Sequence, residues 1–238
     1  MKKIMGNISI ILAVVVLMTT GCSTVKKTNK AQRGGAIGTV GGAVIGGVIG
    51  NNVGKGNTVL GAIIGGVVGG VAGVIIGNKM DRQAEKIKNE IPGAEVQRVG
   101  EGIIVTFNEK NPDGSNMGVY FEFDKSEITA NSKRALDKLV QIFKEYPETN
   151  VLVEGHTDDK GADSYNLALS ERRAMAVGNY LRGEGISSSR LTIKWYGEVQ
   201  PKVENSTDVA RAENRRVEFG IIANDKMKEE AKKEAAGK

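Results

Sequence analysis

One acidic and one basic residue are spaced so that they could bind a ligand that carries both charges. Residues 153–161 read VEGHTDDKG, which places Asp158 in a loop after an expected strand, and Arg173 lies on the helix expected over 164–182. A carboxylate accepts hydrogen bonds from an ammonium, and a planar guanidinium can hold a carboxylate bidentately, which lysine cannot do. The pair therefore suits a ligand with an ammonium and a carboxylate on one carbon atom, with a structural ion pair between Asp158 and Arg173 as the alternative.

Catalytic chemistry is not expected from this sequence. His156 is the only histidine, and the only cysteine, Cys22, lies in the N-terminal segment. A zinc site or a catalytic triad needs more partners than His156 and Asp158 supply. We therefore expect no enzyme activity, no cofactor and no metal ion, and we expect His156 to be a structural loop residue.

Strands and helices alternate around the two charged residues. Helical spacing of apolar residues predicts a helix over about 129–146, and the buried side of the later helix is predicted to carry Leu167, Leu169, Ala174, Val177 and Leu181. Strands are expected at 119–123, 151–153, 191–195 and 217–221, and a short helix should end near residue 214. This order predicts an α+β domain over residues 119–222, a two-layer α/β sandwich in which helices cover one face of a mixed sheet.

Two charged segments flank this domain. Residues 78–118 form a connector, with a helix that Pro92 and Gly93 end and a β-hairpin over 94–107 that should join the edge of the sheet. Residues 223–238 are rich in lysine, glutamate and alanine and show no apolar face. We expect a solvated helix or a frayed charged tail there.

Residues 34–77 contain a repeated glycine pattern. The segments GGAIGTVGGAVIGGVIG (34–50) and GAIIGGVVGGVAGVIIG (61–77) each have glycine at every fourth position, and a polar hinge separates them. So many glycines disfavour a helix in water, whereas a bilayer enforces helical hydrogen bonding and small residues spaced by four let helices approach closely. We expect a membrane-associated helical hairpin; a flexible linker and a β-rich self-associating segment are the alternatives.

The N-terminus is typical of a secretory signal. Two lysines precede a short apolar run, and small residues lead to Cys22. This pattern looks like a lipoprotein signal at residues 1–21, with a lipidated Cys22 and a linker over 22–33. A cleaved signal with an incidental cysteine and an uncleaved anchor are the alternatives.

Charge argues against a nucleic-acid partner. The chain has 33 basic and 28 acidic residues, a net charge of +5. The charge is mild and dispersed, and no stripe of aromatic and basic residues appears.

Four separated blocks occur in an order that resembles the OmpA-like, peptidoglycan-associated family of Gram-negative envelope proteins. They are Gly155-His156-Thr157-Asp158, Tyr165-Asn166, Leu169-Ser170-Glu171-Arg172-Arg173-Ala174 and Asn214-Arg215-Arg216-Val217-Glu218. The resemblance implies that Asp158 and Arg173 bind the diaminopimelate of peptidoglycan and that Asn166 lies near this ligand. It further implies that Thr157, Phe123 and Asp124 line the same edge. It gives Arg216 a structural role and leaves Arg215 open between structure and wall contact.

The expected function is that of an outer-membrane lipoprotein that binds peptidoglycan noncovalently, with its C-terminal domain in the periplasm. The lipid at Cys22, and the glycine-rich hairpin, would provide membrane attachment. Two alternatives remain: a glycine-zipper membrane assembly or pore that the wall-binding domain positions, and a wall hydrolase, which the missing catalytic residues disfavour. Homo-oligomerisation through the glycine-rich segments is left open.

Overall fold

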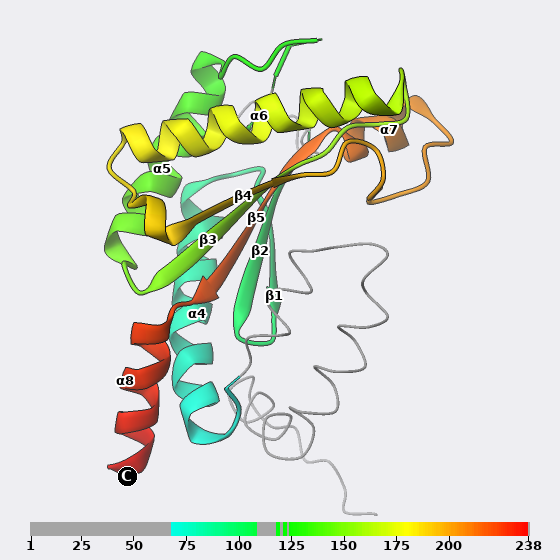
Figure 1. Ribbon diagram of the computed structural model, residues 1–238. Coiled ribbons are helices and arrows are strands. Elements are labelled where there is room, and N and C mark those ends of the chain that lie inside the picture. Colours follow the sequence, from blue (N-terminus) through cyan, green and yellow to red (C-terminus); the bar gives the residue numbers. More distant parts are fainter. Residues whose placement is uncertain (1–67, 109–117, 120, 123, 238) are drawn as a thin grey trace, which may run out of the picture.

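A mixed five-stranded sheet forms the centre of the protein (Figure 1). The computed structural model describes residues 68–108, 118–119, 121–122 and 124–237. In the described part, the strand order is β1-β2-β5-β3-β4. The strands are β1 (Glu95–Val99), β2 (Gly102–Asn108), β3 (Thr149–Gly155), β4 (Leu191–Trp195) and β5 (Arg216–Ala223). Only β3 and β4 are parallel, and the other neighbours are antiparallel.

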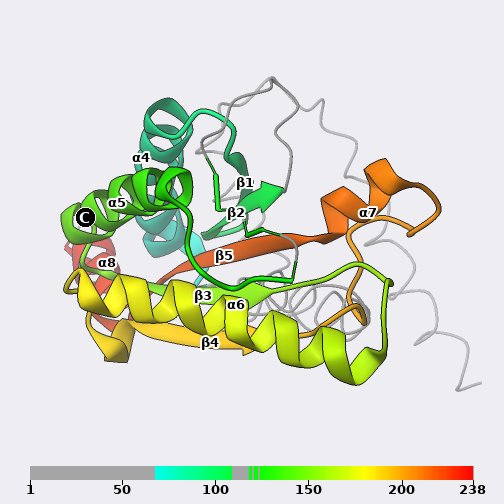
Figure 2. The same ribbon diagram turned by 90° about the horizontal axis from the view of Figure 1, so that it is seen from above.

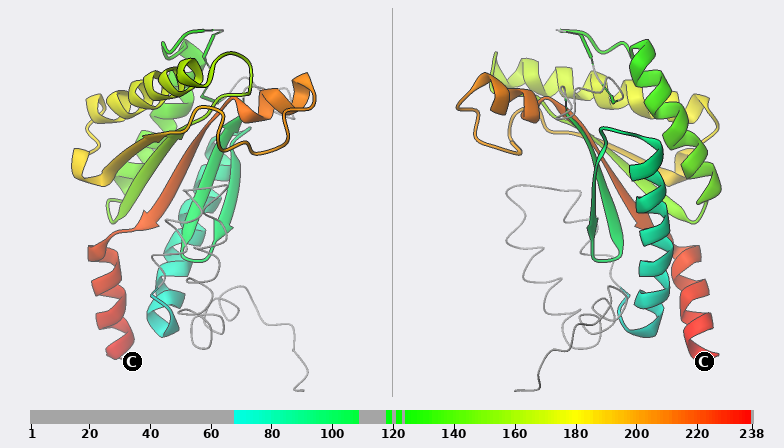
Figure 3. Two further views of the ribbon diagram at one scale, coloured as in Figure 1. Left: turned by 45° about the vertical axis from the view of Figure 1, so that its right-hand side comes forward. Right: turned by 180° about the vertical axis from the view of Figure 1, so that it is seen from behind.

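The described helices are α4 (Gly70–Glu90), α5 (Ala130–Glu145), α6 (Asp163–Gly183), α7 (Asp208–Asn214) and α8 (Asp225–Ala236), with a 3₁₀ turn, η1 (Ser188–Arg190), before β4. Seen from above, α6 runs along β3 and β4 (Figure 2). Figure 3 shows α8 beside α4, although the two helices lie at opposite ends of the described chain.

The core occupies one face of the sheet. Alternate residues of the three central strands point to that face and are buried against α4, α5 and α6: Ile103, Val105, Phe107, Val151, Val153, Val217, Phe219 and Ile221. Phe107 and Phe219 meet edge to face with ring centroids 5.7 Å apart. The opposite face has a small apolar cluster around Ile104 and Leu152. This arrangement confirms the predicted mixed sheet with helices on one face.

The sequence predicted most of the regular elements. The structure confirms the two long helices, the short helix and the strands β3, β4 and β5. It also confirms the hairpin, which joins the sheet where β2 pairs with β5. The strand expected at 119–123 is not: Val119, Phe121 and Glu122, the described residues of that range, lie outside any strand. Instead, Phe121 and Glu122 contact Arg173.

Leu167 was predicted to be buried and is 46% exposed. The buried side of α6 carries Leu169, Ala174, Val177 and Leu181. Leu167 precedes Leu169 by two residues, or about 200° around a helix, and therefore points to the opposite side.

The tail prediction also needs correction, because α8 is helical but not fully solvated. Met227 and Ala231 are each 1% exposed and belong to the main core, and Ala235 packs partly against it. These residues repeat at every fourth position, which gives one narrow apolar stripe on an otherwise charged helix. That stripe packs beside α4.

Helix α4 joins the end of the glycine-rich region to the folded domain. It begins at Gly70 and ends at Glu90, so it crosses the expected boundary between residues 77 and 78. Its buried side carries Ala72, Ile76, Met80, Gln83, Ala84 and Ile87. The first glycine-rich segment and the polar hinge, with the start of the second segment, lie outside the described residues. Among the helices of the described residues, none has the length and apolar character needed to cross a membrane.

Gly155 lies where β3 packs closely against α6, so a larger residue there should destabilise the fold. A Cβ atom there would lie 2.5 Å from the backbone oxygen of Ser170 and 3.2 Å from Ala174 Cβ. We expect Gly155→Ala to lower the free energy of unfolding by about 1–3 kcal/mol, because backbone cannot move aside as a flexible side chain can.

Gly183, at the end of α6, gives the control for Gly155→Ala. Nothing lies within 4 Å of the place that a Cβ atom of residue 183 would take, so Gly183→Ala should leave stability equal or higher. Urea unfolding measures both variants, and equal midpoints for the two would contradict the packing argument.

Candidate functional site

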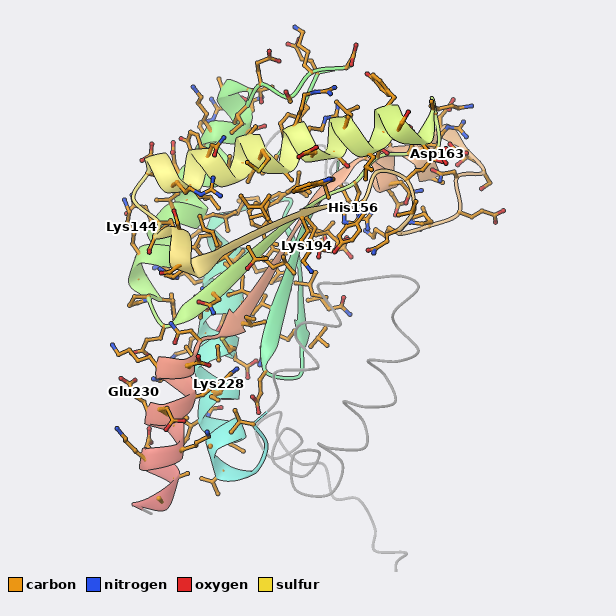
Figure 4. All side chains as sticks on the ribbon, in the orientation of Figure 1. Lys144, His156, Asp163, Lys194, Lys228 and Glu230 are labelled. Carbon is orange, nitrogen blue, oxygen red and sulfur yellow. The ribbon has the colours of Figure 1, made fainter. Side chains whose placement is uncertain are left out.

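A pocket of about 560 Å³ opens where β3 ends and α6 begins. Its walls come from the loop after β3, the first half of α6, the segment around 119–124, and the junction of α7 with β5. Figure 4 shows His156 between α6 and the strands, with Asp163 at the start of α6 on the same side of the molecule. Both Asp158 and Arg173 line this pocket.

Asp158 is held by the turn that follows it. The residue is 7% exposed, and its Oδ1 accepts a hydrogen bond from the Lys160 amide at 3.0 Å. Its Oδ2 accepts from Arg215 Nη1 at 2.5 Å. The ion-pair partner of Asp158 is therefore Arg215, which directly precedes β5.

Arg173 is fixed from the other side of the pocket. Its Nε donates to the carbonyl oxygen of Lys125 at 3.0 Å, and its Nη2 lies 3.4 Å from that of Glu122. The guanidinium lies over the ring of Phe121, 5.1 Å from the centroid. The residue is 8% exposed and still lines the pocket. The segment from Phe121 to Lys125, part of which was predicted as a strand, thus orients the guanidinium with two carbonyl oxygens and an aromatic ring.

Asn166 connects the walls of the pocket. Its Nδ2 donates to the carbonyl oxygen of Lys160 at 3.1 Å and to Glu198 Oε2 at 2.6 Å, and it lies 3.3 Å from the carbonyl oxygen of Asp158. With 2% exposure, Asn166 holds the loop that carries Asp158. The amide of Thr157 donates to the Gly197 carbonyl at 2.9 Å.

The other predicted residues differ in how far the structure describes them. Asp124 lines the pocket in a left-handed conformation, with φ of 58°, and accepts a hydrogen bond from the Tyr165 hydroxyl. That bond raises the pKa of Tyr165 and joins the segment before α5 to the start of α6. Phe123 and Cys22 lie outside the described residues.

A polar cluster is buried next to the pocket. Arg216 Nε donates to Glu218 Oε1 at 2.6 Å, and both side chains are nearly inaccessible. Glu154 and Glu218 are register partners on β3 and β5. His156 stacks on Tyr196 with centroids 5.5 Å apart. Arg216 is thus part of a buried ion pair and also lines the pocket.

Three of these side chains could in principle ligate a metal. In the described part of the chain, donor atoms of Glu154, His156 and Glu218 lie within 4.8 Å of one another. Arg216 already donates to Glu218, however, and its positive charge disfavours a cation beside it. We assign the cluster to a buried ion-pair network.

His156 makes folding sensitive to pH. Burial, and then the charge of Arg216, hold the pKa of His156 well below its ordinary value of 6.5. The unfolded chain therefore binds the proton more readily, so the stability from His156 is complete above pH 6.5 and is lost as the pH falls toward the lowered pKa. We expect His156→Gln to show a smaller decrease in Tm than the unchanged protein between neutral and mildly acidic pH. Parallel Tm curves for the two proteins would contradict this assignment.

The sequence missed the contacts that depend on chain segments far apart. It did not predict the pairing of Arg215 with Asp158, the carbonyl groups of Glu122 and Lys125 around Arg173, or the bond from Asn166 to Glu198. One feature of the sequence indicated that Arg215 belongs to the site: it lies in a block of residues that resembles the OmpA-like family.

Comparisons with known proteins agree with this fold. The OmpA family model matches residues 120–215, and the YMGG-like Gly-zipper model matches residues 1–81. Outer membrane porin F of Pseudomonas aeruginosa is 45% identical over 108 residues, which are 45% of this chain and 31% of that protein. The peptidoglycan-associated lipoprotein of Haemophilus influenzae is 43% identical over 98 residues, 41% of this chain and 64% of that protein.

A crystal structure of a MotB-like protein from Desulfovibrio vulgaris is similar with a TM-score of 0.53 and 25% identity, covering 63% of this chain and 94% of that one. The chain spans less than two thirds of the length of the two curated relatives. The similarity to them thus concerns one domain. The chain is therefore similar to the OmpA family over residues 120–215 and to the YMGG-like Gly-zipper family over residues 1–81.

Proposed function

We propose that this protein is an outer-membrane lipoprotein whose periplasmic C-terminal domain binds peptidoglycan noncovalently through diaminopimelate. The main support for this proposal is that Asp158 and Arg173 line one pocket, in a region of the chain that matches the OmpA family model. The relative named peptidoglycan-associated lipoprotein supports the wall and the membrane as the two partners.

The two charged groups suit the free end of the diaminopimelate side chain. Asp158 accepts from its ammonium, and Arg173 binds the carboxylate on the same carbon atom. The carbonyl oxygens of Glu122 and Lys125 hold the guanidinium before the ligand arrives, so little side-chain entropy is lost on binding. Asn166 and Thr157 fix the loop that carries Asp158, and Asp124 lines the same pocket. For Phe123, a contact with the ligand rests on the family resemblance alone.

Membrane attachment would come from a lipid on Cys22, with the glycine-rich segments as a second contact. Attachment to two extended surfaces raises the effective concentration of each site, so a weak affinity for a single stem peptide would suffice. The domain's role is therefore tethering, and it requires no catalytic step.

Co-sedimentation of the detergent-solubilised full chain with purified sacculi tests this proposal. We expect Asp158→Asn and Arg173→Ala to weaken binding roughly 30-fold or more, since loss of one partner of a buried charge pair costs about 2–5 kcal/mol. The chain offers matched controls, because Asp159 and Arg172 are exposed neighbours of the same types. Asp159→Asn and Arg172→Ala should bind as the unchanged protein does.

Sacculi that contain lysine in place of diaminopimelate provide the second comparison. Lysine has the ammonium but lacks the side-chain carboxylate, so binding through Arg173 should be lost. Equal sedimentation with both kinds of sacculi would refute recognition through diaminopimelate. Unchanged binding by both Asp158→Asn and Arg173→Ala would place the wall contact elsewhere.

A further inference from the structure

The carboxylate proposed to receive the ligand's ammonium already has a cationic partner. Arg215 Nη1 lies 2.5 Å from Asp158 Oδ2, while the other oxygen accepts the Lys160 amide. The Asp158 side chain is 10% exposed and that of Arg215 is 31% exposed. The more accessible partner of the pair is therefore the arginine.

Binding of an ammonium at Asp158 would have an electrostatic consequence for Arg215. Two cations would then share one carboxylate, and each would lose part of its stabilisation. Lys160 and Arg211 line the pocket together with Arg215. Arg211 pairs with Asp208, whose pKa is lowered mainly by Arg211 and further by Lys160 and Arg215, so these charges act on one another.

The balance of charge around Arg215 favours an anion. Asp208 also lines the pocket, but Arg211 already holds its carboxylate. A ligand that brings its own second carboxylate would compensate Arg215 when the ammonium takes its place at Asp158. A ligand with an ammonium and only one carboxylate would provide no such compensation.

We propose that Arg215, with Lys160, forms a second carboxylate subsite that is created when the ligand's ammonium displaces Arg215 from Asp158. The ligand class is a diamino dicarboxylate that is acylated on one amine and has both carboxylates free. This inference rests on the proposed function, in which Asp158 and Arg173 bind the free amino-acid end. It adds a preference among the peptide stems of the wall. The domain should prefer stems in which the carboxylate at the acylated end of the diamino acid is free, with no further residue attached to it.

Two probes isolate this subsite. Both are diaminopimelate acetylated on one amine; in the first the carboxylate of the acetylated end is free, and in the second it is a methyl amide. Both keep the free end that Asp158 and Arg173 would bind. Calorimetric titration of the detergent-solubilised full chain should show the first probe binding about tenfold more tightly, a difference of about 1.4 kcal/mol.

The variant Arg215→Gln distinguishes two models. In the exchange model, the ligand's ammonium displaces Arg215 from Asp158; in the alternative, Arg215 only holds Asp158 in place. In the exchange model this variant loses affinity for the dicarboxylate probe, while the amide probe binds equally well or more tightly because no guanidinium competes for Asp158. If Arg215 only holds Asp158 in place, both probes weaken by the same factor, and the subsite is overturned. Lys160→Gln should lower affinity for the dicarboxylate probe alone.

The remaining outcomes distinguish the subsite from the proposed function. Equal affinity of the unchanged protein for both probes, with binding lost in Arg173→Ala, rejects the subsite and leaves diaminopimelate recognition intact. Failure of both probes to bind the unchanged protein, together with no sedimentation on sacculi, rejects both. Tm values of each variant establish that it is folded.

Discussion

A chain that begins at Ala94 is expected to lose most of its folding stability, although it retains the whole segment that matches the OmpA family. Such a chain lacks α4, whose Ile76, Met80 and Ile87 are fully buried, and also Ile91, which follows the helix and is fully buried too. Burial of four such side chains contributes roughly 8 kcal/mol. The whole stability of a domain is about 5–15 kcal/mol. Urea unfolding of chains beginning at Val68 and at Ala94 measures the difference.

A pair of neighbouring residues on α4 gives the matched control for this prediction. Ile87→Ala should cost about 2–5 kcal/mol as a cavity in the core, whereas Lys88→Ala, at an exposed position, should change stability by less than about 0.5 kcal/mol. An unchanged midpoint for the chain beginning at Ala94 would show that the core does not need α4. The result also decides which fragment can be used to study wall binding.

Removal of the buried guanidinium beside the pocket should have the second largest effect. Arg216→Met would leave Glu218 without its 2.6 Å partner, and both side chains are almost inaccessible to solvent. An uncompensated buried charge costs about 3–5 kcal/mol. We expect a corresponding fall in the urea midpoint at neutral pH.

Two variants test the physical cause of this effect. In Arg216→Met with Glu218→Gln the charge of Glu218 is absent as well, so part of the stability should return. Arg215→Met removes the adjacent arginine, which is 31% exposed and pairs with Asp158. It should cost less than Arg216→Met, because this pair borders the pocket and is more accessible than the Arg216–Glu218 pair. If Arg216→Met unfolds at the same midpoint as Arg215→Met, the buried ion pair does not stabilise the fold.

The secondary structure was predictable where one segment carries its own periodic signal. The apolar spacing that ends at Tyr146 and the alternation through Val217, Phe219 and Ile221 each indicated the correct element. The prediction failed at 119–123, where alternation suggested a strand. There the backbone carbonyl groups of Glu122 and Lys125 accept from Arg173 instead of joining the sheet. A partner on a distant helix cannot be deduced from the alternation of five residues.

The charged tail is a second case in which a contact with a distant segment could not be predicted from the sequence. Met227 and Ala231 are the members of the α8 stripe that are almost completely buried. Composition described the charged faces of this helix correctly but provided no reason to expect a partner. Packing on α4, a helix more than a hundred residues away, determined which side is buried.

The sequence by itself determined the residue types and order that the pocket needs: a loop aspartate after a strand, an arginine on the next helix and an asparagine between them. Their local positions follow from the periodicity of β3 and α6, which each segment carries in its own residues. Only the tertiary structure decided that Arg215 pairs with Asp158 and that a loop holds Arg173, because these contacts join segments separated by tens of residues. Their energies depend on burial and distance, which exist only after the sheet and helices have packed.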